Sequence, residues 1–239
     1  ILATIVYGNQ NGKGFSVDVG ELTGFAEGYG DEDYVDLNRS YFGDTANGTF
    51  SEAYTNSQNG RITADAGTYE NGITYSGLSG LGLLTGDKAK NYVLADSATG
   101  NVEVMKANLN ITFNDIWREY GDTAIRDNGS YGYTQTGLVN MDDANIMFNA
   151  DAASGADGGI IEVDGKQRTN DAGTYNYVDV NDENSVKGLF NNVNFNNYTL
   201  KEVSGGNSKV TPKTLSVSDI LATIVYGNQN GKGFEVDVD

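Results

Sequence analysis

Apolar and polar residues alternate along much of this chain, with a period of two. Six segments show the pattern: Phe15–Val19, Asn101–Met105, Leu109–Phe113, Ile161–Val163, Tyr175–Val178 and Leu215–Ser218. A period of two places successive side chains on opposite faces, as in antiparallel sheets that are solvated on one side. We therefore expect these segments to be β-strands.

Dipeptides that accept a positive φ stand between the alternating segments. They are Asn59-Gly60, Asn71-Gly72, Asn128-Gly129, Asp164-Gly165 and Gly205-Gly206. Such dipeptides close β-hairpins. A helical pattern is confined to Met141–Phe148 and Asn184–Phe190, and each is long enough for only a turn or two. The predicted fold class is all-β with at most short helices, and α+β is the alternative.

A long repeat links the two ends of the chain. Residues 1–19 and 220–238 are identical except for Ser16, which is replaced by Glu235, and their starts lie 219 residues apart. Chance does not produce an identity of this length. The chain therefore contains one repeat and the opening of the next, and the parent protein is predicted to be a tandem array of recent duplicates.

An older repeat lies inside the first. The word Asp65–Tyr69 (Asp-Ala-Gly-Thr-Tyr) recurs 106 residues later at Asp171–Tyr175, and so does Asn-Tyr-x-Leu, from Asn91 to Asn197. The Tyr-Gly word at Tyr7 recurs at Tyr120, 113 residues later. The two offsets add up to the long repeat. Each repeat is therefore expected to consist of two homologous β-rich modules in tandem, forming an elongated unit.

The offsets set the expected domain boundaries. Residues 1–106 form the first module, 107–212 the second, and 213–239 the start of the next repeat. In the second module Leu109–Phe113 precedes the Tyr-Gly word, and the first module as given lacks the equivalent strand. We expect the 213–239 tail of a neighbouring copy to fill that sheet edge. In the alternative, the boundaries lie near residues 20 and 130 and the tail closes its own second module.

Composition excludes several functions. Asp and Glu number 33 against 15 Lys and Arg, a net charge of −18, so we expect no nucleic-acid or anionic-membrane partner. With neither His nor Cys, a disulfide, a zinc-thiolate site and a His-based triad are impossible within this chain. No apolar run approaches the length of about 18 residues that a spanning helix needs, so membrane insertion is not expected.

The order of the repeated words resembles a known family. A Tyr-Gly word after a strand, a Gly-rich middle, Asp-Ala-Gly-Thr-Tyr and Asn-Tyr-x-Leu lead to an alternating strand, which is Val210–Val217 in the second copy. This order is similar to the mostly-beta, glycine-rich modules and YDG modules of large bacterial surface adhesins and filamentous haemagglutinin-like exoproteins. The sequence departs from the family in two places. The Asp of the Tyr-Asp-Gly word is absent at Tyr7-Gly8 and Tyr120-Gly121, and Met105-Lys106 replaces Thr-Pro.

The resemblance implies an extracellular stalk or spacer at the bacterial cell surface or in a secreted adhesin. Such a segment projects a binding region and supports adhesion or biofilm formation, and its partners are the neighbouring repeats of the same chain. The alternative is a module that itself binds a host receptor or glycan. We expect no enzyme, because nothing in the sequence singles out a pair of carboxylates for glycoside hydrolysis.

Five aromatic residues are predicted to be structural. Tyr69, Tyr92, Tyr175 and Tyr198 recur at the 106-residue offset beside turn words, so we expect their rings to pack against the sheet. Trp117 is the only tryptophan, and we expect it in the core or packed between modules.

Acidic clusters at Asp31–Asp36 and Asp179–Asn184 are the candidates for a metal site. Asp179, Asn181 and Asp182 resemble the calcium-ligand word of cadherin domain junctions, and oxygen-rich clusters suit Ca²⁺. The EF-hand spacing and the repeated RTX nonapeptide are absent, and the alternative is a solvated acidic loop. We predict no cofactor and no divalent metal required for folding, with these three residues as the calcium candidates.

Overall fold

The computed structural model describes residues 1–9, 15–51, 62, 64–140, 142–218, 221–226 and 235–237, and within them the fold is β-rich, as predicted. The first half contains β1 (Leu2–Val6), β2 (Ser16–Asp18), β3 (Asp36–Leu37), β4 (Gly48–Phe50), β5 (Gly67–Ser76), β6 (Leu84–Thr85) and β7 (Ser97–Met105). The second half contains β8 (Ala107–Phe113), β9 (Ile116–Glu119), β10 (Tyr133–Thr136), β11 (Met147–Phe148), β12 (Ile160–Val163), β13 (Lys166–Thr169), β14 (Gly173–Asn176), β15 (Phe190–Asn191), β16 (Tyr198–Gly205) and β17 (Asn207–Thr211). The tail carries β18 (Leu221–Thr223) and β19 (Glu235–Asp237).

The α-helices of the described residues are three short segments in the second half. They are α1 (Asp142–Asn145), α2 (Ala150–Gly155) and α3 (Glu183–Lys187). The first and last coincide with the two helical patterns in the sequence, whereas no such pattern predicts α2. Asn149 begins α2 by accepting a hydrogen bond from the Ala152 N–H, which is a local cap that apolar periodicity does not reveal.

The first half is built on a five-stranded sheet with the order β2-β1-β7-β5-β4. β1 runs parallel to β7, and the other neighbours are antiparallel. The predicted alternation is visible in β7, where Val102 and Val104 are buried while the side chains between them face solvent. β3 and β6 pair separately as a short two-stranded ladder.

The second half begins where the chain leaves β7 and enters β8 through Lys106. β8 lies between antiparallel β10 and parallel β16. A second sheet has the order β14-β17-β9, and β11–β15 and β12–β13 form two short ladders. Asp164-Gly165 closes the β12–β13 hairpin with φ values of 51° and 69°, as the sequence predicts.

The two halves share one pairing scheme. β5 pairs with β7 as β14 pairs with β17, so that Gly67↔Val104 corresponds to Gly173↔Val210 at the 106-residue offset. β1 lies parallel beside β7 as β9 lies beside β17, at the 113-residue offset. The β3–β6 ladder likewise has its counterpart in β11–β15. The repeated words of the sequence therefore occupy equivalent strand positions.

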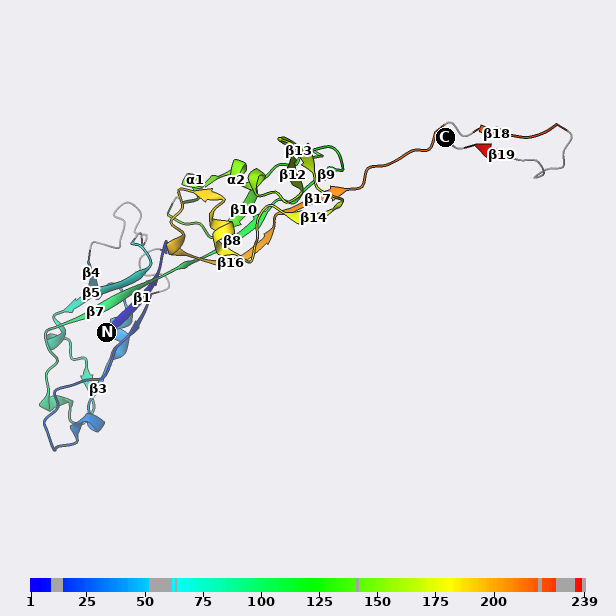
Figure 1. Cartoon of the computed structure of the whole chain (residues 1–239). Coiled ribbons are helices and arrows are strands. Elements are labelled where there is room, and N and C mark those ends of the chain that lie inside the picture. Colours follow the sequence, from blue (N-terminus) through cyan, green and yellow to red (C-terminus); the bar gives the residue numbers. More distant parts are fainter. Residues whose placement is uncertain are drawn as a thin grey trace.

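The tail repeats the opening of the chain. β18 pairs with β19 in the register of β1 with β2, so that Leu2↔Asp18 becomes Leu221↔Asp237, 219 residues later. Figure 1 shows an elongated molecule in which the two halves follow one another and the tail extends from the far end of the second half.

Residues 212–218 connect the second half to this hairpin as extended chain without strand pairing. The predicted strand at Leu215–Ser218 is therefore wrong for the single chain. Leu215 is 90% exposed and Val217 is 68% exposed, because no sheet edge lies beside them.

The core is one continuous apolar cluster that runs through both halves. It contains Ile5, Tyr75 and Val104 of the first half and Leu109 and Tyr198 of the second. Continuous packing of this kind resists bending at the junction, since protein interiors are close-packed.

Two of the predicted hairpin dipeptides have other roles. Asn71-Gly72 lies inside β5, where Asn71 has a φ of 51° and the register shifts between Tyr69 and Ile73, so it forms a bulge. Gly205-Gly206 has φ values of 78° and 80°, but the parallel pairing with the β8–β9 segment continues across it. A positive φ serves a bulge or a kink as well as a turn. Asn59-Gly60 lies outside the described residues.

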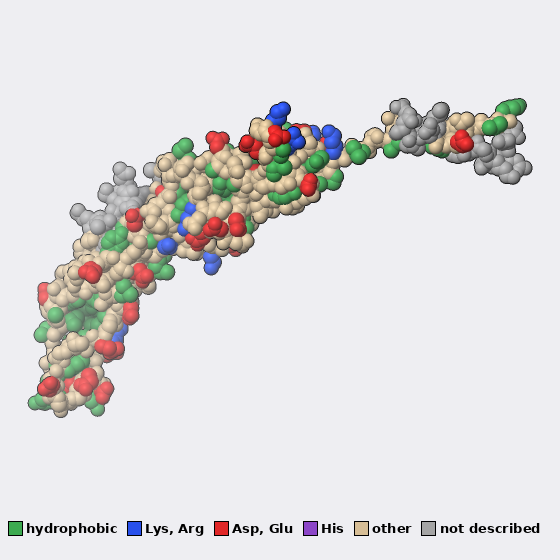
Figure 2. Space-filling view, in the orientation of Figure 1, with side chains coloured by type: hydrophobic (Ala, Val, Ile, Leu, Met, Phe, Trp, Pro, Cys, Tyr) green, Lys and Arg blue, Asp and Glu red, His purple; other side chains and the backbone are tan. Residues whose placement is uncertain are grey.

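The described surface is strongly acidic. Figure 2 shows Asp and Glu side chains spread over both halves, with few Lys and Arg among them, in line with the net charge of −18. No helix formed by the described residues has the length and apolar character needed to cross a membrane.

Candidate functional site

The contacts between the two halves form the most elaborate site in the described part of the chain, and we call it the joint. It brings residues 7–8 and 62–66 against residues 138–142 and 194–198. The turn at Gly8 has a φ of 76°, and its N–H donates to the Ile62 carbonyl at 2.8 Å. A Cβ at Gly8 would collide with the side chain of Val139, so the close approach requires glycine.

Two tyrosines and one carboxylate hold the centre of the joint. The rings of Tyr7 and Tyr198 meet edge to face, with centroids 5.6 Å apart. Both hydroxyls donate to the carboxylate of Asp142, and the Val139 N–H donates to the Tyr198 hydroxyl at 3.1 Å. Burial and the bond to Asp142 raise the pKa of Tyr198, so its phenol stays protonated and remains a donor.

Asparagines bind the other side of the joint. Asp65 Oδ1 accepts from Asn197 Nδ2 at 2.8 Å and from Asn194 Nδ2 at 3.1 Å. Asn197 is only 2% exposed, and its Oδ1 accepts from the Ala66 N–H at 2.8 Å. Asn140 Nδ2 donates to the Ile62 carbonyl at 2.8 Å. Directional bonds on both sides of an apolar contact fix the orientation of one half against the other.

The four tyrosines of the repeated words lie in matched pairs. Tyr69 and Tyr175 each donate to the backbone carbonyl four residues earlier, at 2.8 and 2.9 Å, and this closes the Asp-Ala-Gly-Thr-Tyr word. Tyr198 lies in the joint. Tyr92 occupies its equivalent position in the first half, where its hydroxyl donates to Asp31 at 2.9 Å and its ring meets Phe25 edge to face.

Trp117 does not lie in the core, contrary to expectation. It is 36% exposed, because Ile116 and Arg118 take the inward positions of β9 and alternation turns the residue between them outward. Beside it lies an open groove of about 580 Å³, whose lining includes Lys209 and Asn207. An aromatic face next to polar side chains is a surface that suits a sugar or a peptide.

The calcium candidates are engaged in local backbone contacts. Asp179 Oδ1 accepts from the Asn181 N–H at 3.0 Å, and Asp182 Oδ1 accepts from the Asn184 N–H at 2.9 Å, which caps α3. Within the described ranges, no three acidic side chains are grouped in a way that would hold a metal ion. The predicted independence of folding from divalent metal stays a prediction.

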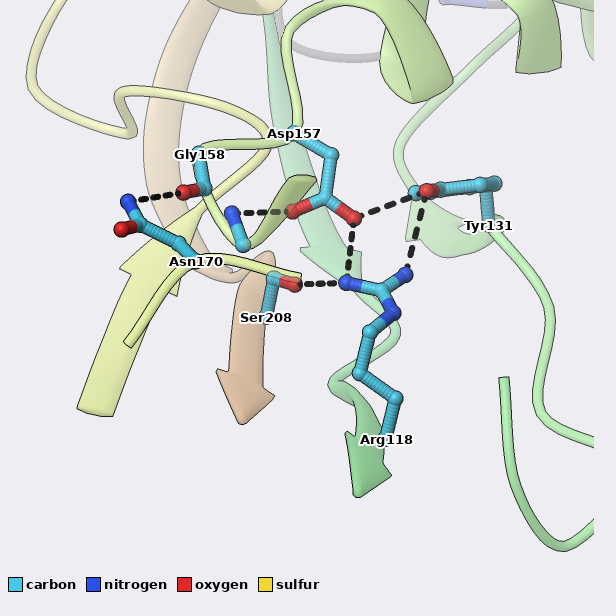
Figure 3. A network of polar contacts seen from close by, with 7 residues as sticks. Arg118, Tyr131, Asp157, Gly158, Asn170 and Ser208 are labelled. Atoms are coloured by element: carbon cyan, nitrogen blue, oxygen red, sulfur yellow. Dashed lines mark hydrogen bonds and ion pairs between the residues drawn. The ribbon is translucent and has the colours of Figure 1, made fainter. Parts of the chain in front are cut away.

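A buried ion pair in the second half is not predicted by the sequence. Arg118 Nη1 lies 2.9 Å from Asp157 Oδ2 and donates to Ser208 Oγ at 2.8 Å, and the Tyr131 hydroxyl donates to Asp157 at 2.8 Å (Figure 3). The side chains of the pair are 1% and 0% exposed. Asp157 Oδ1 also accepts from the Gly159 N–H, so the network ties the loop after α2 to β9 and β17. Closed to solvent, it is a structural tether and has no access to a substrate.

The equivalent positions in the first half are apolar. At the two offsets, Arg118 corresponds to Ile5 and Ser208 to Val102, and these two side chains are 2% and 0% exposed. The one signal in the sequence is a charged residue at an inward position of an alternating segment, Ile116-Trp-Arg-Glu. A buried arginine is seldom found without a partner, but the sequence does not identify that partner.

Comparison of the chain with protein-family models, curated proteins and solved structures found no match.

Alkaline pH is expected to destabilise the chain. Burial raises the pKa of Tyr75 and Tyr177 to about 12, so in the unfolded chain these phenols ionise first, near pH 10. Their contribution to stability is complete below pH 10 and is lost as the pH rises towards 12, on the order of 2 kcal/mol for each. Urea unfolding at pH 9 to 12 measures this loss, and Tyr75→Phe should make it smaller. An unfolding free energy that is constant over this range would contradict the burial of these phenols.

Proposed function

We propose that this chain is a structural repeat of a tandem array, built from two homologous β-modules and serving as the stalk of a bacterial surface or secreted adhesin. The observation that carries the proposal is the recurrence of one strand register at each sequence offset. It occurs in the first half, again in the second, and for a third time in the β18–β19 hairpin. Repeats whose units contact only their neighbours build length.

The joint supports a stiff connection between modules. A continuous apolar cluster, an edge-to-face tyrosine pair and hydrogen bonds on both sides leave little freedom between the two halves. The net charge of −18 supports the same role, because parallel stalks of like charge repel one another and stay soluble. The extracellular role rests on the family resemblance of the repeated words. We assign the chain no catalytic activity.

Chains of one, two and three copies test the spacer role. Small-angle scattering should give a maximum dimension that grows by an equal increment with each copy, because each joint repeats the same geometry. A chain of three copies that is no longer than one copy, or that collapses into a compact particle, would rule out a spacer.

Binding of a glycan or receptor peptide is the second candidate function, and the exposed Trp117 beside its groove favours it. Glycan-array binding by the chain, lost in Trp117→Ala and kept in Tyr120→Ala, would support this function. Tyr120 is a matched control because it is an exposed aromatic residue that follows the same strand and does not line the groove. Absence of binding by the unmodified chain would leave the groove without a glycan role.

A further inference from the structure

A groove in the first half separates two segments that a strand would be expected to join. Two adjoining hollows of about 190 and 280 Å³ lie between residues 20–25 and residues 92–98. Glu21, Leu22, Leu94 and Ala95 line both of them. Leu22 and Leu94 are half-buried, so the groove offers apolar surface along its length.

In the second half, the equivalent position is occupied by β8. β10 and β16 flank β8, and at offsets of 113 and 106 residues they correspond to residues 20–23 and 92–99. These are the two sides of the groove. Among the described residues of the first half, no strand lies between them.

An open sheet edge runs along the same groove. Over Ser97–Gly100, β7 pairs with β5 on one side. The described pairing of β1 on the other side begins only at Asn101. The N–H and C=O groups of that second edge are thus free of ladder partners over these residues in the described chain, and such an edge is a template for an added strand.

The tail has the features of the missing strand. Residues 213–218 are the counterpart of β8 at the 106-residue offset, and they follow β17 as directly as β8 follows β7. Leu215 and Val217 are 90% and 68% exposed, whereas their counterparts Leu109 and Ile111 are 0% and 1% exposed. The tail leaves the end of the molecule farthest from its own groove, so it reaches the groove of another copy (Figure 1).

We propose that residues 213–218 of one copy enter the groove of the next copy as an added strand, antiparallel to residues 20–23 and parallel to residues 92–98. Transfer of the β8 register places Leu215 beside Leu94, and Val217 between Leu22 and Ser97. This inference rests on the proposed tandem array. It is independent of the role of the array at a cell surface.

The rest of the joint has counterparts on the two free ends. Tyr120-Gly121 at the far end of the second half matches Tyr7-Gly8, and Tyr120 is 46% exposed. Near the groove, the Tyr92 hydroxyl donates to Asp31 and accepts from the Ala26 N–H, as Tyr198 does with Asp142 and the Val139 N–H. The contact between copies therefore reproduces the joint within a copy.

Disulfide trapping in a two-copy chain tests the proposed register. Val217→Cys is placed in the first copy and Ser97→Cys in the second, in a protein that has no other cysteine. Adjacent residues on parallel strands lie within the Cα distance of about 4.4–6.8 Å that a disulfide spans. We expect both thiols to disappear on mild oxidation while the molecular mass stays that of one chain.

The matched control moves the second cysteine to Ser76, which pairs with Ser97 on the side away from the groove. That site lies two strand spacings from Val217, about 10 Å, so no disulfide should form. Free thiols with Ser97→Cys, or equal trapping at positions 97 and 76, would overturn the proposal. If the copies extend linearly in scattering but are not trapped, the spacer role stands and the added strand is wrong. If the copies are trapped but do not extend, the added strand stands and the spacer role is wrong.

Discussion

Leu109→Ala is expected to destabilise the single chain by about 2–5 kcal/mol, whereas Leu215→Ala leaves its stability unchanged. The two leucines hold equivalent positions, 106 residues apart. Leu109 is fully buried in β8, so its truncation removes apolar contacts and leaves a cavity. Leu215 is 90% exposed and has no such contacts to lose. Urea unfolding of the two variants measures the difference.

In a two-copy chain the same substitution at Leu215 of the first copy should become costly. The groove of the second copy would then bury this side chain as β10 and β16 bury Leu109. We expect a loss comparable to that of Leu109→Ala, confined to the joint between copies. Pro212→Ala, which changes an exposed residue of the same tail outside the proposed strand, serves as the control. Equal stability of the two-copy chain with and without Leu215→Ala would contradict the account.

Asp157→Ala should destabilise the second half by about 3–5 kcal/mol, because it leaves the guanidinium of Arg118 buried without its counter-charge. The Tyr131 hydroxyl and the Gly159 N–H lose their acceptor in the same substitution. Guanidinium or urea denaturation followed by circular dichroism gives the unfolding free energy. Lys187→Ala, which breaks an ion pair with the exposed Glu183, should leave the midpoint nearly unchanged.

A double substitution separates the charge effect from packing. Arg118→Ile together with Asp157→Ala removes both charges and places at position 118 the residue that the first half carries as Ile5. Since apolar replacement of a buried pair is often neutral, most of the lost stability should return. A double variant as unstable as Asp157→Ala alone would show that packing or hydrogen bonding, rather than the unpaired charge, carries the cost.

Repetition made much of the fold accessible from the sequence. A word that recurs must occupy equivalent structure, and the offsets found at Asp65 and Tyr7 are those of the observed strand registers. Alternation located β7 and β8 because each has one buried and one solvated face. At Leu215–Ser218 the same pattern is extended chain in the single copy, since a strand forms only beside a partner.

The site was less accessible, because it depends on contacts between distant residues. Asp142 joins Tyr7 and Tyr198 across more than fifty residues of chain, and no local pattern announces that meeting. The Arg118–Asp157 pair has no counterpart in the first half, so the internal repeat concealed it. The chemistry of Trp117 predicts a core position, whereas the alternation of β9, with its neighbours inward, already places it outside.

Amide hydrogen exchange at Leu215–Val217 tests the central claim most directly. In the single chain these amides belong to extended, unpaired chain and should exchange rapidly. In the first copy of a two-copy chain they should exchange slowly, with protection close to that of Leu109–Ile111, because the joint between copies repeats the joint within a copy. Equally rapid exchange at Leu215–Val217 in the single and two-copy chains would contradict the account.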